Sequence, residues 1–353
     1  MREFCGLYAK EVKNFLEGEG EKAFRSKQLF DWVYQKGATQ YGEMLNIPES
    51  LRSLLNEKVS LGLLTLEKVE DSEDGETAKF LWKLPCDRFV ESVLISSGER
   101  RTVCVSSQVG CPAKCSFCAS GKEGLIRNLT SAEIVEQVVL INHYLIQKGE
   151  RVSHIVFMGM GEPLENYASV IRALKIFIDP ELFNFSPRRI TVSTVGMAPN
   201  IKRLMLEGIK VNLALSLHAP NQKIRKKIVP YARKYSLEEV LKSVRDYARF
   251  TKRDITYEYV MLDGINDQKE NAEELALLLK GDQCCVNLIP FNPVPGIHLK
   301  RPERGTIEAF RNILTKRGIR STWRYTKGKD IAAACGQLAL KQKKPLEIDG
   351  KLV

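Results

Sequence analysis

The stretch SHIVFMGMGEPLENYASVIRALKIFI, residues 153–178, decides the fold class. It runs from a short apolar strand pattern, through a glycine-containing turn, into a segment with apolar residues at helical spacing. The same order repeats across residues 106–340. Because repeated strand–helix units build parallel sheets, the pattern predicts a full or partial barrel or a doubly wound sheet.

Strands and helices are expected to alternate throughout this region, and in such folds ligands bind at the carboxyl ends of the strands. The expected strands are SHIVFMG (153–159), RITVSTVG (189–196), VNLALSLHA (211–219), ITYEYVML (255–262), CVNLIPFN (285–292) and IRSTWRY (319–325). The expected helices include SAEIVEQVVLINHYLIQ (131–147), YASVIRALKIFI (167–178), SLEEVLKSVRDYARFT (236–251) and NAEELALLLKG (271–281).

Three other segments have different patterns. Residues 1–63 predict a small helical domain, whose aromatic side chains we expect in its core because Phe24, Leu29, Trp32 and Val33 recur at helical spacing. Residues 64–105 contain short β-rich runs separated by Asp-Gly and Ser-Gly turns, which predict a connector of a few antiparallel strands. Residues 341–353 are expected to form a basic tail.

Composition excludes several classes of protein. The 353 residues are 44% hydrophobic and 27% charged, which is typical of globular domains. The first residues, MREFCGLYAKEVKNF, lack an apolar signal segment, and no stretch approaches the roughly 18 apolar residues of a membrane span. We therefore expect a cytoplasmic protein without membrane contact. In that setting nine cysteines indicate metal binding or thiol chemistry rather than a disulfide framework.

Positive charge is concentrated in two regions of an otherwise acidic chain. The net charge is +11, but residues 186–234 carry +10 and residues 301–353 carry +8, which leaves −7 for the rest. Such clustering suggests a polyanionic partner or, equally, a solvated basic surface. The runs IRKKIVPYARKY (224–235) and TKRGIRSTWRYTKGKD (315–330) interleave basic and aromatic residues, as phosphate contact and base stacking require.

Three cysteines form the strongest chemical motif. Cys111, Cys115 and Cys118 lie in CPAKCSFCASG with C-x3-C-x2-C spacing. A structural zinc site usually takes four ligands as two separated pairs, whereas three closely spaced thiolates suit three irons of a 4Fe–4S cluster and leave the fourth iron open. A zinc knuckle or three buried thiols are the alternatives.

The cysteine loop, with Phe117 before its last cysteine, resembles that of radical S-adenosylmethionine enzymes, and VFMGMGEPL (156–164) resembles their glycine-rich segment. Further segments resemble the ribosomal RNA adenine methyltransferases of the RlmN/Cfr family over nearly the whole chain. These are CVSSQVGCPAKCSFCASG (104–121), STVGM (193–197), LALSLHAP (213–220), IPFNPVPG (289–296) and DIAAACGQL (330–338). The resemblance implies a partial (β/α)6 barrel with an N-terminal helical accessory domain.

The resemblance also implies a mechanism with two catalytic cysteines. An adenine amidine carbon is too electron-poor to attack a methyl group directly, so the family uses a radical route through a methylated cysteine. Cys335 matches the methyl-carrying cysteine, Cys104 the resolving thiol that forms a transient disulfide with it, and Glu91 the proton acceptor. Four cysteines match no motif and are assigned to packing: Cys5, Cys86, Cys284 and Cys285.

S-adenosylmethionine is expected at the ends of successive strands. The residues that match the family's cofactor-binding positions are Gly161, Glu162, Ser193, Ser216, Leu217, His218 and Asn292. Glycine permits close backbone approach, and the hydroxyls can bond ribose or carboxylate oxygens. Gly159 is expected to be structural.

The implied substrates are 23S rRNA and some tRNAs, with an unidentified electron donor such as flavodoxin and a monomeric enzyme. One branch of the family methylates adenine C2 and the other C8, and FRSKQLFDWVYQKG with DIAAACGQL looks closer to the C2 branch. The target base is expected to be flipped out of its surroundings to reach the cysteine. A glycyl-radical activase, or an iron–sulfur protein that binds RNA and senses redox state, would share the cluster loop but would not need the two catalytic cysteines.

Overall fold

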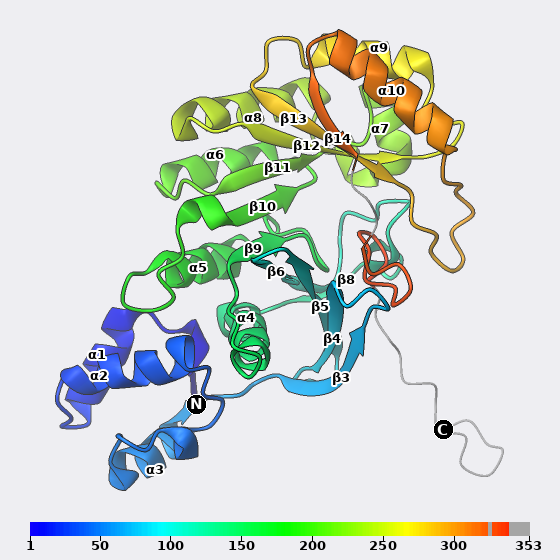
Figure 1. The fold of residues 1–353 in the computed structure, drawn as a ribbon. Coiled ribbons are helices and arrows are strands. Elements are labelled where there is room, and N and C mark those ends of the chain that lie inside the picture. The colour runs from blue at the N-terminus through cyan, green and yellow to red at the C-terminus, as the bar shows by residue number, and fades with distance from the viewer. Residues whose placement is uncertain (324–326, 339–353) are drawn as a thin grey trace.

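A computed structural model describes residues 1–323 and 327–338, so the expected basic tail lies outside the described residues. The core is one ten-stranded sheet in the order β14-β13-β12-β11-β10-β9-β6-β5-β4-β3 (Figure 1). Six consecutive strands from β9 to β14 are parallel, and the chain returns through helices between them. This arrangement is the predicted partial (β/α)6 barrel.

All six expected strands are present in the core. They are β9 (His154–Phe157), β10 (Ile190–Thr194), β11 (Asn212–Ser216), β12 (Ile255–Met261), β13 (Cys284–Pro290) and β14 (Arg320–Trp323). The expected helices are α4 (Ser131–Ile146), α5 (Tyr167–Ile178), α8 (Leu237–Thr251) and α9 (Lys269–Leu278). Three further helices lie in the crossovers, namely α6 (Ala198–Leu206), α7 (Gln222–Ile228) and α10 (Arg304–Lys316).

The β-rich connector continues the barrel sheet. Its antiparallel strands are β3 (Thr65–Asp71), β4 (Thr77–Lys83), β5 (Phe89–Ser97) and β6 (Arg100–Cys104). The last of them pairs in parallel with β9, with Cys104 opposite Val156. The connector therefore forms one side of the same sheet, which brings Cys104 to the edge where the barrel strands end.

The N-terminal helices pack against the outside of the barrel (Figure 1). They are α1 (Ala9–Gly18), α2 (Phe24–Phe30) with a π-helical turn over Asp31–Gln35, and α3 (Glu49–Lys58), and a short parallel pair, β1 (Arg2–Glu3) and β2 (Val59–Ser60), closes the unit. Arg172 of α5 donates to the Gly6 carbonyl at 2.6 Å and forms an ion pair with Glu11. The interface is therefore polar as well as aromatic.

The expectation of buried aromatics in the helical unit is wrong for Phe24. Leu29 and Val33 are fully buried, but Phe24 is 52% exposed and lies under the Arg25 guanidinium, 4.8 Å from the ring centroid. Phe24 is the first residue of α2, where a side chain can remain in water although its helical spacing matches that of the core residues. Within the described residues, no helix is long and apolar enough to cross a membrane.

Candidate active site

An open cavity of ≈ 840 Å³ lies at the carboxyl ends of the barrel strands. The cavity brings together residues from seven separate parts of the sequence. Among its lining residues are nine of the predicted site residues: Cys111, Cys115, Cys118, Gly161, Glu162, Ser193, Ser216, His218 and Cys335.

The three motif cysteines occupy the loop between β7 (Gln108–Gly110) and β8 (Leu125–Asn128). Burial raises the pKa of all three thiols, that of Cys111 to about 12, although the backbone of Ala113 and Gly161 hydrogen-bonds to Cys111 and opposes the shift. Ligation by iron would therefore displace three protons.

The loop fits a cluster better than a single ion. In the described part of the chain, no three or more His, Cys, Asp or Glu side chains are arranged to hold one metal ion. Thiolates that bind a four-iron cluster each sit on a different iron, so their sulfurs stand farther apart than those around one zinc ion. Three thiols on one loop that lines the cavity match the donor set of a four-iron cluster with one open iron.

The glycine-rich turn after β9 is shaped by close backbone packing. Gly161 has φ +107°, and a Cβ there would lie 2.7 Å from both the Gln108 Cβ and the Ser107 Oγ. A Cβ at Gly159 would lie 2.7 Å from the Ser106 Oγ and the Val105 carbonyl oxygen, consistent with its expected structural role. Both positions therefore require glycine for packing.

Glu162 is buried in the same turn. Its carboxylate accepts hydrogen bonds from the backbone amides of Leu164 at 3.0 Å and Val195 at 2.7 Å. Burial raises its pKa to about 7, while these hydrogen bonds act in the opposite direction. Glu162 therefore ties the turn after β9 to the end of β10, and the residue is part of the cavity lining.

The ends of β10 and β11 present the predicted polar side chains. The Ser193 and Ser216 hydroxyl oxygens lie 3.4 Å apart across the two strands. His218 has a left-handed backbone, φ +58°, and its Nδ1 accepts a hydrogen bond from the Val260 amide at 3.0 Å. Burial, followed by the charge of Arg225, lowers the His218 pKa to about 3, so the neutral ring carries its proton on Nε2.

Two predicted cofactor residues lie outside this cavity lining. Leu217 is fully buried, and its main chain accepts a hydrogen bond from Arg225 and donates one to the Glu258 carbonyl. Asn292 lines a neighbouring cavity and donates from its side-chain amide to the Cys335 carbonyl at 3.1 Å. In the described structure, Asn292 therefore supports the Cys335 segment.

Cys335 is an exposed thiol that borders three adjoining cavities. The first contains the motif cysteines, the second opens beside Arg100 and Lys327, and the third contains Cys104. Main-chain carbonyls of its segment accept hydrogen bonds from Ala119, Ser120 and Lys79. Contacts from the cluster loop and from β4 therefore fix this segment over the cavity.

Cys104 and Glu91 lie on the connector side of the site. Cys104, at the end of β6, shares a cavity of ≈ 480 Å³ with Cys335. Glu91 is buried two residues before Val93, which lines that cavity, and its carboxylate lies 3.4 Å from the Lys79 Nζ. Lys79 also donates to the Ile331 carbonyl at 2.6 Å, so this buried cation links Glu91 to the Cys335 segment.

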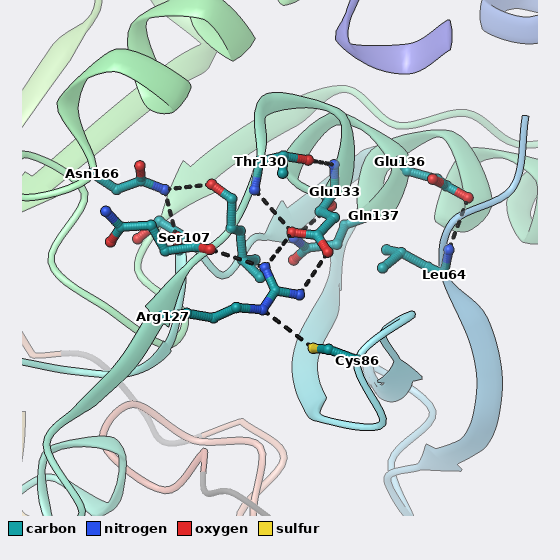
Figure 2. A network of polar contacts seen from close by, with 11 residues as sticks. Leu64, Cys86, Ser107, Arg127, Thr130, Glu133, Glu136, Gln137 and Asn166 are labelled. Atoms are coloured by element: carbon teal, nitrogen blue, oxygen red, sulfur yellow. Dashed lines mark hydrogen bonds and ion pairs between the residues drawn. The ribbon is translucent and has the colours of Figure 1, made fainter. Parts of the chain in front are cut away.

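A hydrogen-bond network holds the chain between Cys104 and Cys111 (Figure 2). Gln137 of α4 accepts from the Ser106 amide at 2.8 Å and donates to the Ser106 carbonyl at 3.0 Å. The Asn166 side-chain amide donates to the Ser107 carbonyl at 2.8 Å, and Arg127 forms a double ion pair with Glu133 at the start of α4. The network fixes the path from Cys104 to the loop of motif cysteines.

The structure contradicts the prediction for Arg225. Its position in the basic run 224–235 predicts an exposed phosphate contact, but its side chain is fully buried. Its guanidinium donates to the carbonyls of Leu217 at 3.1 Å and Ser216 at 3.2 Å, and also to that of Val195. Tyr231 of the same run is buried as well and bonds Glu165, so only Lys226, Lys227, Arg233 and Lys234 remain as exposed cations there.

Two other expectations need correction. Cys86 is exposed and accepts a hydrogen bond from the Arg127 Nε at 3.3 Å, so it is not a packing residue (Figure 2). In the second basic run, Arg317 pairs with Glu273 at 2.8 Å and Arg320 pairs with Asp254. Carboxylates of the protein itself therefore neutralise part of the positive charge that the sequence predicts to be free for a polyanionic partner. Lys79 and Arg225 gave no signal in the sequence beyond their residue type, because their roles depend on burial.

Comparison with known proteins identifies similarities over the whole site. Residues 105–276 match the radical SAM superfamily, and residues 3–61 match the ribosomal RNA large subunit methyltransferase N-terminal domain. The probable dual-specificity RNA methyltransferase RlmN 2 of Protochlamydia amoebophila is 58% identical over 95% of this chain and 93% of that protein. The corresponding RlmN protein of Thermotoga neapolitana is 42% identical over 97% and 99%. A crystal structure of a radical SAM methyltransferase from Sphaerobacter thermophilus superposes with a TM-score of 0.94 at 44% identity, covering 96% and 99% of the two chains.

Proposed function

Because the chain belongs to the RlmN family of radical SAM RNA methyltransferases, which use a 4Fe–4S cluster and S-adenosylmethionine, we propose that it methylates C2 of an adenosine at the peptidyl-transferase centre of 23S rRNA. The second proposed substrate is adenosine 37 of some tRNAs, in keeping with the dual-specificity names of its relatives. The enzyme would act as a cytoplasmic monomer with a separate electron donor, such as flavodoxin.

The observation that carries the proposal is the position of Cys335 between three cavities. One cavity holds the three cysteines that we assign as cluster ligands, Cys111, Cys115 and Cys118. Another holds Cys104, and the third opens beside two cations, Arg100 and Lys327. A sulfur in this position can react in turn with a cofactor, an RNA base and a second thiol.

When bound, the cluster and S-adenosylmethionine supply the methyl group and the one-electron chemistry that begins the reaction. Gly161, Glu162, Ser193, Ser216 and His218 would hold the cofactor, with the His218 Nε2–H as a neutral donor. Leu217 and Asn292 would support cofactor binding indirectly. Leu217 accepts a main-chain hydrogen bond from Arg225, and Asn292 holds the segment that contains Cys335.

The catalytic residues divide the later steps between them. Cys335 would carry the methyl-derived carbon and join it to adenine through a carbon–carbon bond. Glu91, held beside Lys79, would then take the proton from the substituted adenine carbon. The Cys104 thiolate would attack the Cys335 sulfur, which forms a disulfide and breaks the sulfur–carbon bond, and the freed methylene carbon would take up a proton to complete the methyl group of the released base.

The base is proposed to enter through the cavity beside Arg100 and Lys327. That cavity has a volume of ≈ 940 Å³ and leads to Cys335 without passing the motif cysteines. An RNA base must leave its stack to enter this cavity and reach the Cys335 thiol. Phosphate contacts by the surrounding cations predict that RNA affinity falls as salt rises, and a flat salt response would contradict this part of the proposal.

Mass spectrometry of adenosines tests the reaction. RNA lacking the modification is incubated anaerobically with reconstituted enzyme, S-adenosylmethionine and a reductant. The expected product is 2-methyladenosine, whereas 8-methyladenosine would assign the chain to the C8 branch. Cleavage of S-adenosylmethionine with neither product would contradict RNA methylation and favour an activase.

Cysteine variants test the assigned roles. Cys335→Ala is expected to abolish methylation, whereas Cys104→Ala is expected to leave RNA covalently attached to the protein. Cys285→Ala is the matched control, because Cys285 lies on β13, is half-buried and lines none of the three cavities. Methylation that survives Cys335→Ala would refute the assignment.

A further inference from the structure

Arg225 is a charged side chain buried without an acidic partner. Its exposed fraction is 0%, and none of the ion pairs among residues 1–323 and 327–338 includes it. Its three acceptors, the carbonyls of Val195, Ser216 and Leu217, are neutral groups. These contacts satisfy its N–H donors but leave its positive charge uncompensated.

Burial of this charge needs an explanation, because an uncompensated buried ion strongly destabilises the folded state. The helix that carries it, α7, also carries Lys223, Lys226 and Lys227, and all three are exposed. The helix therefore places its other cations in water and turns one toward the strand ends. A buried charge of this kind is expected where an anion arrives later.

The nearest candidate anion is the cluster loop. Two of the three carbonyls that hold the guanidinium belong to Val195 and Ser216, which line the same cavity as Cys111, Cys115 and Cys118. The Ser116 amide, next to Cys115, donates to the Ile228 carbonyl at the end of α7 at 2.9 Å. A main-chain contact therefore ties the buried cation to the loop of motif cysteines.

A four-iron cluster on three thiolates is an anion. Its one-electron reduction adds a further negative charge in the same low-dielectric site, where nearby charges interact strongly. A fixed positive charge beside the loop favours both retention of the cluster and its reduced state. Since three carbonyls hold the guanidinium, the charge cannot move away when the cluster is reduced.

We propose that Arg225 is a positioning residue that provides the cluster with a buried positive charge and thereby favours its reduction. Compensation by the cluster also accounts for the burial of Arg225. The inference rests on the proposed function only through the cluster, and its test contains no RNA. A failure to methylate RNA would therefore leave it standing.

The test is the reduction equilibrium of the cluster in the full-length protein. Wild type, Arg225→Gln, Arg225→Lys and Lys223→Gln are reconstituted anaerobically to equal iron content and titrated with dithionite under electron paramagnetic resonance. Arg225→Gln keeps two N–H donors but removes the charge, whereas Arg225→Lys keeps the charge. Lys223→Gln removes an exposed charge from the same helix.

We expect Arg225→Gln to shift the equilibrium about tenfold toward the oxidised cluster, which is about 59 mV for a one-electron couple. Arg225→Lys should shift it less than threefold, and Lys223→Gln should leave it unchanged. If Arg225→Gln folds but loses the cluster while Arg225→Lys retains it, the charge is again what the cluster requires.

Three results would overturn the inference. An unchanged equilibrium in a loaded Arg225→Gln protein would make the guanidinium a clamp for carbonyls only. Equal shifts in Arg225→Gln and Arg225→Lys would assign the effect to lost hydrogen bonds. Failure of both variants to fold as apoprotein, judged by circular dichroism, would show that the fold itself needs Arg225.

Discussion

Glu136 makes the stability of the protein depend on pH. One oxygen of its buried carboxylate accepts from the backbone amides of Leu63 at 2.7 Å and Leu64 at 3.1 Å (Figure 2). The other oxygen, Oε2, is buried and has no hydrogen-bond partner among the described residues. Burial raises the Glu136 pKa from 4.5 to about 7, against the effect of the two hydrogen bonds.

Because the folded-state pKa of Glu136 is raised, its contribution to the free energy of unfolding falls as pH rises. A carboxyl whose folded pKa lies above its unfolded pKa stabilises the protein fully below pH 4.5 and loses this contribution as pH rises through about 7. The difference corresponds to about 3 kcal/mol, of which about 2.5 kcal/mol falls between pH 5 and pH 8. Above pH 7 the folded protein contains a buried carboxylate with one oxygen that has no hydrogen-bond partner among the described residues.

Glu136→Gln removes this titration and keeps the acceptor oxygen. The free energy of unfolding of the apoprotein is measured in urea with a reductant at pH 5, 6, 7 and 8. The difference between variant and wild type should rise by about 2.5 kcal/mol in favour of the variant from pH 5 to pH 8. Glu57→Gln, at an exposed position of α3, should give a constant difference. Parallel pH curves for wild type and Glu136→Gln would refute the reasoning.

Three further substitutions test the architecture. Gly161→Ala should destabilise the apoprotein by about 2 kcal/mol or more and weaken S-adenosylmethionine binding, because φ is +107° and the new Cβ would lie 2.7 Å from Gln108. Gly149→Ala, at φ +74° with open space around it, should cost only about 1 kcal/mol in the same urea assay, and equal losses would argue against the clash. Lys79→Met should cost about 3 kcal/mol, because it removes a buried cation from Glu91 and Glu70, and a loss below about 1 kcal/mol would show that the pairs contribute little. Arg172→Ala should speed tryptic cleavage within residues 1–63 of the native protein, since Arg172 bonds Gly6 and Glu11, and an unchanged cleavage rate would show that aromatic packing alone holds this unit.

Local sequence patterns predicted most of the barrel. The six parallel strands and the helices α4, α5, α8 and α9 lie where periodicity placed them, because each buries a regular apolar face. Spacing likewise indicated the cluster loop, since three thiolates within eight residues must lie close together. The exposure of Phe24 shows the limit of this reasoning, because spacing does not reveal whether a partner covers the residue.

The sequence by itself determined the order of elements and the chemistry of the Cys111–Cys118 loop, because both depend on residues that are neighbours in the chain. Only the tertiary structure decided which distant residues meet. It brought Cys335 to the same cavity as Cys104, placed Lys79 beside Glu91, and turned Arg225 from a surface run into the interior. The physical reason is that burial and charge pairing depend on contacts across the fold, and residue type alone carries no record of them.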